Sequence, residues 1–346
     1  MRLEIDPHGD TLITFQDANT LFGADLKTAP EKQFLVSRKH LMLASRRASK
    51  VLEGSLKEAT PEEDGLFHWN FEPIFDAKAF EIVMKIIHGQ TRDVPVTVNV
   101  CMLSQITAIV DDLECQNSVW FFAKGWLSQI KGQIPRGMSE DLMRWILISF
   151  VFEESEIFKT VTGIAIGNST DIMLTLDLPI RSKILEDMST RRKSIFSNLI
   201  YRLHNLESQL LEQSLGCNQG CRAMMLGTFS QGLKLNSLLP LPLPPYYTLR
   251  VTSILLQLRK IKGPDYYCPQ EDCTSQTYSG AWKLESRPLP RQKPAAFGLF
   301  GSPKNEEKVP SSLVRHNCRL EDHLKGILDT VDVEIKGLEL SNYLST

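Results

Sequence analysis

The pattern of apolar and polar positions predicts a small sheet at the start of the chain. Short β-favouring segments at residues 3–5 and 11–15 flank the turn residues 6–10, and this arrangement predicts a hairpin. Two more strands are predicted at residues 32–36 and 66–71, the second because it is rich in aromatic side chains. The turns between these segments carry Gly, Pro, Asn and Asp, which end strands.

Helical spacing takes over after this sheet. Apolar residues recur at i, i+3, i+4 and i+7 from Phe80 to Ile87, which predicts one face of a helix that ends near Gly89. The same spacing predicts further helices at residues 41–52, 103–113, 120–130, 139–152, 181–188, 190–215, 223–235, 249–261 and 320–335. We therefore expect an α+β fold, with a sheet and helical cluster in residues 1–130 and a mostly α-helical extension in residues 131–346.

Two features of the extension refine this picture. In the helix at 190–215 the apolar side chains form a single stripe, and the basic residues Arg191, Arg192 and Lys193 lie off it, which predicts a solvated basic face. Residues 285–310 contain five prolines among Gly, Ser and Lys, which predicts a mobile loop. No repeat of 20 to 50 residues is visible.

Charge and composition exclude several classes of function. The chain of 346 residues has 39 Lys and Arg against 41 Asp and Glu, a net charge of −2. Without a long-range positive field, binding to nucleic acid or to an anionic membrane is not expected as the main activity. Residues 235–249 are uncharged but contain four prolines, so they do not predict a membrane-spanning helix.

The N-terminus and the cysteines indicate the compartment. The acidic residues Glu4 and Asp6 stand where a secretory signal would begin its apolar run, so export is not predicted. The cysteines are seven, an odd number, which fits reduced thiols better than a disulfide framework. We expect an intracellular protein of the cytoplasm, the nucleus or both.

Particular residues in the first part resemble a known family. Residues 9–13, residues 34–45 and residues 52–58 together resemble the BTB/POZ domain, particularly its filamentous-fungal variety. Residues 76–89 look like that family's fourth helix region, and residues 103–120 look like its final helix pair. The resemblance covers about a third of the chain and is most specific in residues 36–58. Beyond residue 130, the chain resembles the long C-terminal extension of fungal BTB proteins, from which no activity can be carried over.

This resemblance implies a non-enzymatic protein–protein interaction module. It implies self-association through the first helix and the N-terminal strand and, for some members, docking to a cullin-type ubiquitin ligase scaffold as a substrate adaptor. Adaptors of that sort use a hydrophobic residue, any residue and then glutamate, a pattern that Leu56, Lys57 and Glu58 match. An apolar anchor beside a charge-assisted bond is the physical basis of such docking. The alternative is a solvated loop in which Leu56 packs inward.

Two departures from the family pattern concern its aromatic residues. The family has an aromatic after the helix-starting serine, where this chain has Arg46 after Ser45. It also has an aromatic before the closing glycine, where this chain has His88 before Gly89. Both aromatics belong to the packing of the helical cluster, so we expect the fold to persist, whereas the geometry of a homodimer does not follow from the family pattern.

The extension contains five of the seven cysteines, and their spacing suggests a metal site. Zinc takes four nitrogen or sulfur ligands, which proteins commonly offer as two close pairs from separate segments. The pair Cys217 and Cys221 with the pair His316 and Cys318 would form such a structural zinc site. Cys268, Cys273 and His323 are substitute ligands. The alternative is that these thiols are small buried apolar groups or unligated.

The sequence gives little support to an enzyme. Residues 162–167 contain two glycines but lack the lysine of a phosphate-binding loop, so they are interpreted as a turn beside an apolar segment. His40, His68 and His204 stand alone, as packed or surface histidines do. A second hypothesis is a nuclear regulatory scaffold that dimerises through the BTB-like part and contacts chromatin or a transcription factor. The basic clusters at residues 191–193 and 287–304 motivate it.

Overall fold

The computed structural model describes residues 2–16, 31–170, 177–212, 214–263, 266–267, 314–315 and 318–344. The chain has the predicted α+β fold and forms two compact units, which we call unit 1 and unit 2. Unit 1 consists of Met1–Ser197, Leu243–Ile254 and Val331–Thr346, and unit 2 consists of Asn198–Pro242 and Leu255–Thr330. The predicted boundary near residue 130 lies inside unit 1 and stays a prediction. The predicted loop at 285–310 lies outside the described residues.

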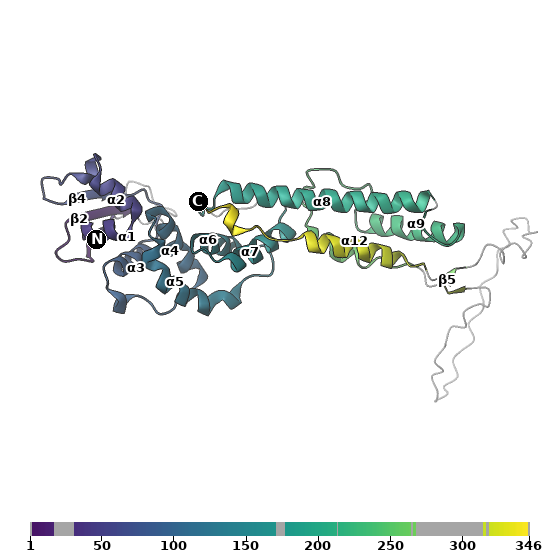
Figure 1. Ribbon diagram of the computed structural model, residues 1–346, viewed down its shortest axis with the longest axis horizontal. Helices are drawn as coiled ribbons and strands as arrows, with labels where there is room; N and C mark the ends of the chain where they lie inside the picture. Colours follow the sequence, from purple (N-terminus) through teal and green to yellow (C-terminus); the bar gives the residue numbers. More distant parts are fainter. Residues whose placement is uncertain are drawn as a thin grey trace, which may run out of the picture. The chain divides into compact units, whose positions relative to one another are not determined.

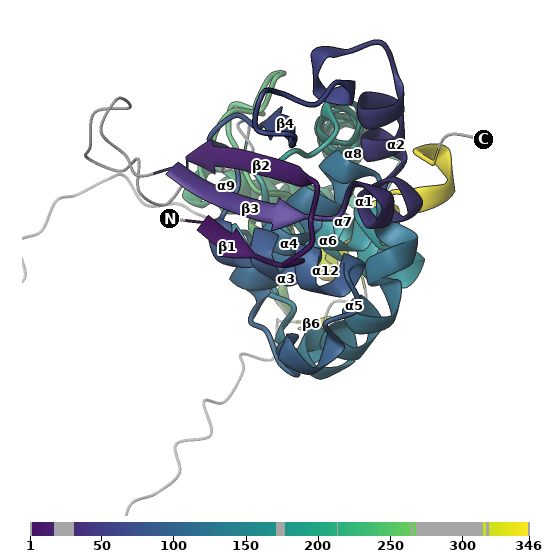
Figure 2. The ribbon, with the colours of Figure 1, turned by 90° about the vertical axis from the view of Figure 1, so that its left-hand side faces the viewer.

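A four-stranded mixed sheet opens unit 1, in the order β1-β3-β2-β4 (Figure 2). Its strands are β1 (Arg2–Glu4), β2 (Thr11–Gln16), β3 (Glu31–Val36) and β4 (Phe67–Asn70). Strand β2 is antiparallel to β3, whereas β1 is parallel to β3 and β4 is parallel to β2. The strands expected at 32–36 and 66–71 are confirmed, but the hairpin is wrong, because β3 lies between β1 and β2. The backbone N–H groups of Ile5 and Asp6 both donate to Leu35 O, which ties the end of β1 to β3.

The helices of unit 1 cover this sheet and continue into a helical layer (Figure 1). They are α1 (Arg38–Ala44), α2 (Arg46–Glu53), α3 (Ala77–Ile87), α4 (Val100–Leu113), α5 (Gln116–Ile130), α6 (Glu140–Val151) and α7 (Ser155–Asn168). Short 3-10 helices lie at Lys57–Ala59, Thr91–Asp93, Lys131–Gln133 and Leu340–Asn342. The helix predicted at 41–52 is two helices that meet at Ser45. The side chain of Ser45 accepts a hydrogen bond from Ala48 N and donates one to Leu113 O, so it caps α2 and fixes α2 to α4.

The core of unit 1 is continuous from the sheet to α7. Phe15 and Phe34 stack with ring centroids 5.5 Å apart, and Phe80 of α3 lies 4.9 Å from Phe15. Helix α6 is buried over most of its surface and packs against α4 and α7, with Trp145 fully buried. Ser139 caps it by accepting from Leu142 N at 3.2 Å. Helices on both sides of residue 130 therefore share one core.

Helix α7 corrects the interpretation of residues 162–167 as a turn, since they lie within it. The glycine at 163 permits a close approach, because a Cβ there would lie 3.1 Å from Gly337 N. A Cβ on Gly337 itself would lie 1.7 Å from Lys159 O, so only glycine fits at this contact. Leu338 N donates to Thr162 Oγ1 at 2.9 Å. Gly337 thus follows the last helix, as predicted, and also lets the C-terminal segment pack on α7.

Helix α8 (Ser182–Leu211) is continuous through residue 189, where the sequence predicted two helices. Its residues up to 197 belong to unit 1 and the rest to unit 2. The predicted apolar stripe is confirmed, since its members are all nearly fully buried: Ile195, Leu199, Leu203, Leu206 and Leu210. Arg192 is only 1% exposed, so its prediction as part of a solvated face is wrong. Its guanidinium donates to the carbonyl oxygens of Ser169, Tyr246 and Leu249.

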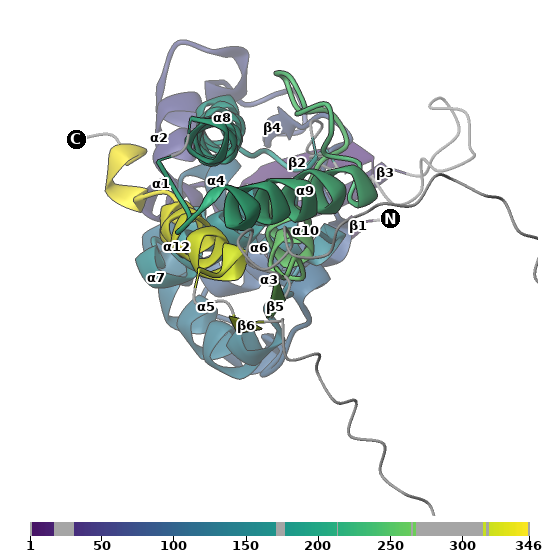
Figure 3. The same ribbon diagram turned by 90° about the vertical axis from the view of Figure 1, so that its right-hand side faces the viewer.

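Unit 2 is formed by helices and one small ribbon (Figure 3). Helix α9 (Gln219–Leu235) begins four residues before its predicted start. Helices α10 (Val251–Leu258) and α12 (Leu320–Glu334) follow near their predicted positions, and α10 up to Ile254 and α12 from Val331 belong to unit 1. Strands β5 (Tyr266–Tyr267) and β6 (Val314–Arg315) pair antiparallel. Arg259 and Asp329 form an ion pair at 2.9 Å, which joins the segment after α10 to α12. Among the helices described, none has the length and apolar character needed to cross a membrane.

Candidate functional site

The segment expected to bind a partner follows α2. Gly54 ends that helix, and a Cβ there would lie 2.8 Å from Lys50 O, so glycine allows the chain to turn away closely. Leu56 then leads into the 3-10 turn Lys57–Ala59. The Leu56 side chain is 51% exposed, so it does not pack inward as the alternative interpretation required. Glu58 is half-buried in the same turn, two residues further on.

A second exposed apolar side chain lies on the first helix. Leu43 of α1 is 89% exposed, more than any other large apolar residue that the structure describes. Strand β1 is an edge of the sheet, and only one of its sides pairs with another strand. The sequence pattern did not single out Leu43, because Leu41, Met42 and Leu43 follow one another in a seven-residue helix, and such a run has no periodicity to show which side chain faces outward.

His88, the residue at the C-terminal end of α3, makes two specific hydrogen bonds. His88 Nε2 accepts a hydrogen bond from Ser37 N at 2.9 Å, and Nδ1 donates to Met84 O at 2.8 Å. Ser37 is the residue that caps α1. Burial lowers the pKa of His88 below its usual value of 6.5, and neighbouring His40 lowers the pKa further, against the raising effect of its hydrogen bonds. The neutral imidazole therefore joins the end of α3 to the start of α1.

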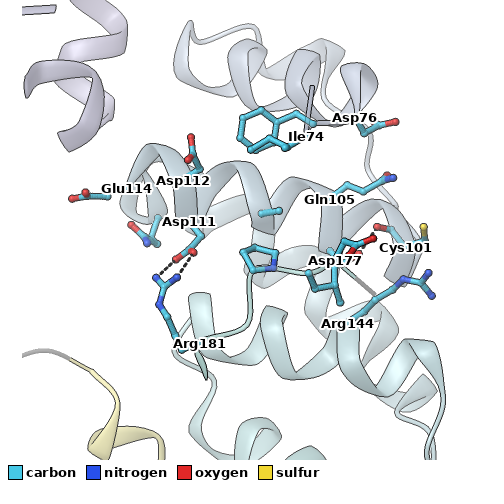
Figure 4. A pocket seen from close by; sticks show the side chains of 16 residues that line it. Ile74, Asp76, Cys101, Gln105, Asp111, Asp112, Glu114, Arg144, Asp177 and Arg181 are labelled. Carbon is cyan, nitrogen blue, oxygen red and sulfur yellow. Dashed lines mark hydrogen bonds and ion pairs between the residues drawn. The ribbon is translucent and has the colours of Figure 1, made fainter. Parts of the chain in front are cut away.

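A groove of about 890 Å³ lies over α4 in unit 1 (Figure 4). Several of its charged residues are bound to one another or to neighbours. Both carboxylate oxygens of Asp111 accept from Arg181, at 2.8 and 2.9 Å, and Asp112 accepts from Arg47. Arg144 donates to Glu140 and to Asp141. The pair of Arg181 and Asp111 ties the segment before α8 to α4, whereas the pairs of Arg144 lie within α6.

Three of the four predicted metal ligands meet in unit 2. The Sγ atoms of Cys217, Cys221 and Cys318 all lie within 4.8 Å of one another. His316, Cys268 and Cys273 lie outside the described residues. His323 is described, and it is not part of this group. We call Cys217, Cys221 and Cys318 the thiol triad.

The local fold explains how the triad forms. Asn218 caps α9 by accepting from Cys221 N at 2.8 Å, so Cys217 and Cys221 lie on either side of the helix start. Gly216 has a φ of +89°, and a Cβ on it would lie 3.1 Å from Cys221 Sγ. Glycine therefore lets the chain turn tightly over the thiols. Cys318 comes two residues before α12 begins at Leu320.

Cys221 does not have the character of a reactive cysteine. Cys221 is 1% exposed, and burial raises the pKa of its thiol to about 11. A nucleophilic cysteine instead needs a lowered pKa and access to solvent. Three sulfur atoms as close together as those of the triad can instead hold a soft cation between them.

Comparisons with known proteins add no relative to this picture. No protein-family model matches the chain, and no curated protein sequence is significantly similar to it. The evidence for function therefore comes from the residues of this chain and their positions in the structure. Of the predicted site residues, the structure exposes Leu56 and brings the three cysteines together.

Proposed function

We propose that this chain is a non-enzymatic interaction protein whose unit 1 self-associates and docks on a cullin-type ubiquitin ligase scaffold as a substrate adaptor. The observation that carries the proposal is the exposure of an apolar side chain at both places where the BTB/POZ resemblance expects a contact. Leu56 follows α2, and Leu43 lies on α1. The resemblance of residues 36–58 supplies the class of partner.

The docking contact is proposed to centre on Leu56. A leucine that passes from exposed to buried on binding contributes roughly 1.5 to 3 kcal/mol. Glu58, two residues later, would add a charge-assisted hydrogen bond to a donor on the partner. An anchor of this kind at the centre of a contact carries a large share of binding energy, while its neighbours mainly exclude water.

Self-association is proposed to use α1 and β1. Leu43 offers an apolar contact on the helix, and β1 offers the unpaired backbone groups of an edge strand. Edge strands readily pair with a strand of another chain. The helix and the strand are the two elements that the family resemblance assigns to self-association.

The groove over α4 favours a binding protein over an enzyme as well. Its most prominent acid, Asp111, is held by two hydrogen bonds from Arg181, and a carboxylate held in this way is not available to take a proton from a substrate. Asp112 is half-buried beside Arg47, and burial raises the pKa of its carboxyl while Arg47 lowers it.

The test measures the binding of full-length protein to a purified cullin scaffold by titration calorimetry. The double variant Leu56→Ala with Glu58→Ala should weaken binding at least about tenfold, because it removes the anchor and the charge together. Lys57→Ala is the matched control, since Lys57 is exposed in the same turn and is not expected to contact the partner. Equal binding by the double variant and the wild type would refute the docking site.

Self-association is measured separately by light scattering. Leu43→Glu places a charge in the proposed contact and should shift the protein toward monomer, whereas Lys39→Glu, an exposed change on the same helix, should not. A wild-type protein that stays monomeric at high concentration would refute the self-association proposal. That result would leave the docking test unaffected.

A further inference from the structure

We propose that the thiol triad binds one Zn²⁺ ion, which holds the start of α9 to the start of α12 in unit 2. The role is structural. It is independent of the proposed interaction function, because every residue involved lies in unit 2.

The positions of the sulfur atoms support a metal first. Zinc binds thiolate sulfur at about 2.3 Å in a tetrahedron, which places two sulfur ligands about 3.8 Å apart. The three Sγ atoms already lie within 4.8 Å of one another, although Cys318 is far from Cys217 and Cys221 in the sequence. Movement of about an ångström would complete the three-sulfur face of a tetrahedron. Thiolate ligands select thiophilic ions such as zinc over magnesium or calcium.

The backbone supports negative sulfur at this position. Cys221 is the third residue of α9, a helix of 17 residues, and Cys318 lies just before α12, a helix of 15 residues. The N-terminal end of a helix carries partial positive charge, which stabilises a thiolate against the cost of burial. Three thiolates and one Zn²⁺ give a net charge of −1, and two helix starts offset this charge. Figures 1 and 3 show α9 and α12 side by side.

The conformation of Gly216 is independent evidence for a preformed metal-binding loop. Its positive φ and missing side chain bring the backbone over Cys221, and a Cβ would also lie 2.8 Å from Cγ of Arg222. Any other residue would press on the thiol or on its neighbour. The turn therefore has the close backbone approach that a compact metal-binding loop requires.

The experiment measures metal in untagged full-length protein, purified with a thiol reductant and without chelator. We expect about one zinc per chain by elemental mass spectrometry, as a single site requires. Replacement by Co²⁺ should give the ultraviolet thiolate-to-metal charge-transfer band and the visible bands of tetrahedral cobalt. The charge-transfer intensity should fall by about one third in Cys217→Ser, Cys221→Ser or Cys318→Ser where metal is retained, since each variant loses one of three thiolates.

Two variants serve as matched controls. Cys101→Ser changes an exposed cysteine of unit 1, and His323→Ala changes a residue of α12 outside the triad; both should keep zinc and the full cobalt spectrum. A variant that fails to fold does not weaken the test, because the cobalt spectrum of the wild type reports the sulfur ligands directly.

Three results would overturn the proposal. One is zinc far below one per chain together with no charge-transfer band after cobalt is added to the reduced protein. Another is metal that is lost in His323→Ala but kept in all three cysteine variants. The third is a disulfide between Cys217 and Cys221 in freshly isolated protein, detected as two thiols that resist alkylation until a reductant is added.

Discussion

The core around α6 and the start of α9 hold helices together by different means. In unit 1, α6 is buried against α4 and α7 by apolar side chains, with Trp145 fully inside. In unit 2, the starts of α9 and α12 converge on three thiols. Burial of apolar surface is non-directional and tolerates related side chains, whereas a metal site needs particular atoms at particular distances. We therefore expect the stability of unit 1 to depend on the volume of its buried side chains. The stability at the thiol triad should depend on whether the three sulfur atoms are present.

The largest expected effect is the removal of Trp145. Trp145→Ala should lower the stability of unit 1 by about 3 to 5 kcal/mol, through lost burial and the cavity that remains. Trp145→Phe should cost clearly less, because the indole Nε1 finds no hydrogen-bond partner among the described residues. Hydrogen exchange of peptides from α4 and α6 measures the loss region by region.

The matched control for Trp145 is Phe121→Ala, at a side chain of α5 that is 75% exposed. It should change exchange little. Bound zinc should be the same in all of these variants, because none of them alters a residue of unit 2. Loss of zinc from Trp145→Ala at a temperature where the protein stays folded would contradict the independence of the apolar core of unit 1 and the thiol triad of unit 2.

The buried arginine is the next test, because it is the charged side chain among the buried polar residues that the structure describes in unit 1. Arg192→Ala should cost about 3 kcal/mol, since it leaves the carbonyl oxygens of Ser169, Tyr246 and Leu249 without their donor inside the protein. Arg181→Ala removes a guanidinium that is half exposed and paired with Asp111, and should cost about 1 kcal/mol or less. Urea unfolding of both variants gives the comparison, and equal losses would contradict the role assigned to burial.

Two helix caps compare the units directly. Ser139→Ala removes the cap of α6, and Asn218→Ala removes the cap of α9; each should cost about 1 kcal/mol. Only Asn218 lies between two residues of the thiol triad. Asn218→Ala should therefore also speed the release of zinc to a colorimetric chelator, whereas Ser139→Ala should not. Equal release rates in the two variants would show that the cap does not position the thiols.

Much of this fold could be predicted, because local periodicity decides it. The cap of α6 at Ser139, the stripe of α8 and the strands β3 and β4 all follow from patterns within a few residues. The hairpin failed because strand order depends on pairing with β3, which local turn residues do not reveal. The prediction of a single helix at residues 41–52 failed for a related reason. The hydroxyl of Ser45, where the two helices meet, bonds to Leu113 O, which is far away in the sequence.

The candidate sites show the same limit. The spacing of Cys217 and Cys221 was visible in the sequence, and so was the match of residues 56–58 to the adaptor pattern. Tertiary packing decides whether Cys318 lies near this pair and whether Leu56 faces outward. Arg192 is the clearest error, because a helical pattern counts an arginine off the apolar stripe as solvated. It cannot show that backbone carbonyls from two other segments surround the side chain.

The smallest expected effect is a pH dependence in unit 1, at the contact between His88 and Ser37. Burial lowers the pKa of His88 below 6.5, so the unfolded chain binds the proton more readily than the folded one. The contribution of the neutral histidine is therefore complete above pH 6.5 and is lost as the pH falls from there toward the lowered pKa.

His88→Gln should remove this dependence, because an amide oxygen accepts from Ser37 N without titrating. Urea unfolding from about pH 7.5 to about pH 5.5 should show wild type losing stability relative to the variant. His40 and Asp6 lie near enough to influence this histidine. Parallel curves for the two proteins would mean that those neighbours, or groups elsewhere, set the acid response. In that case the contact between His88 and Ser37 would contribute through its shape rather than through its charge.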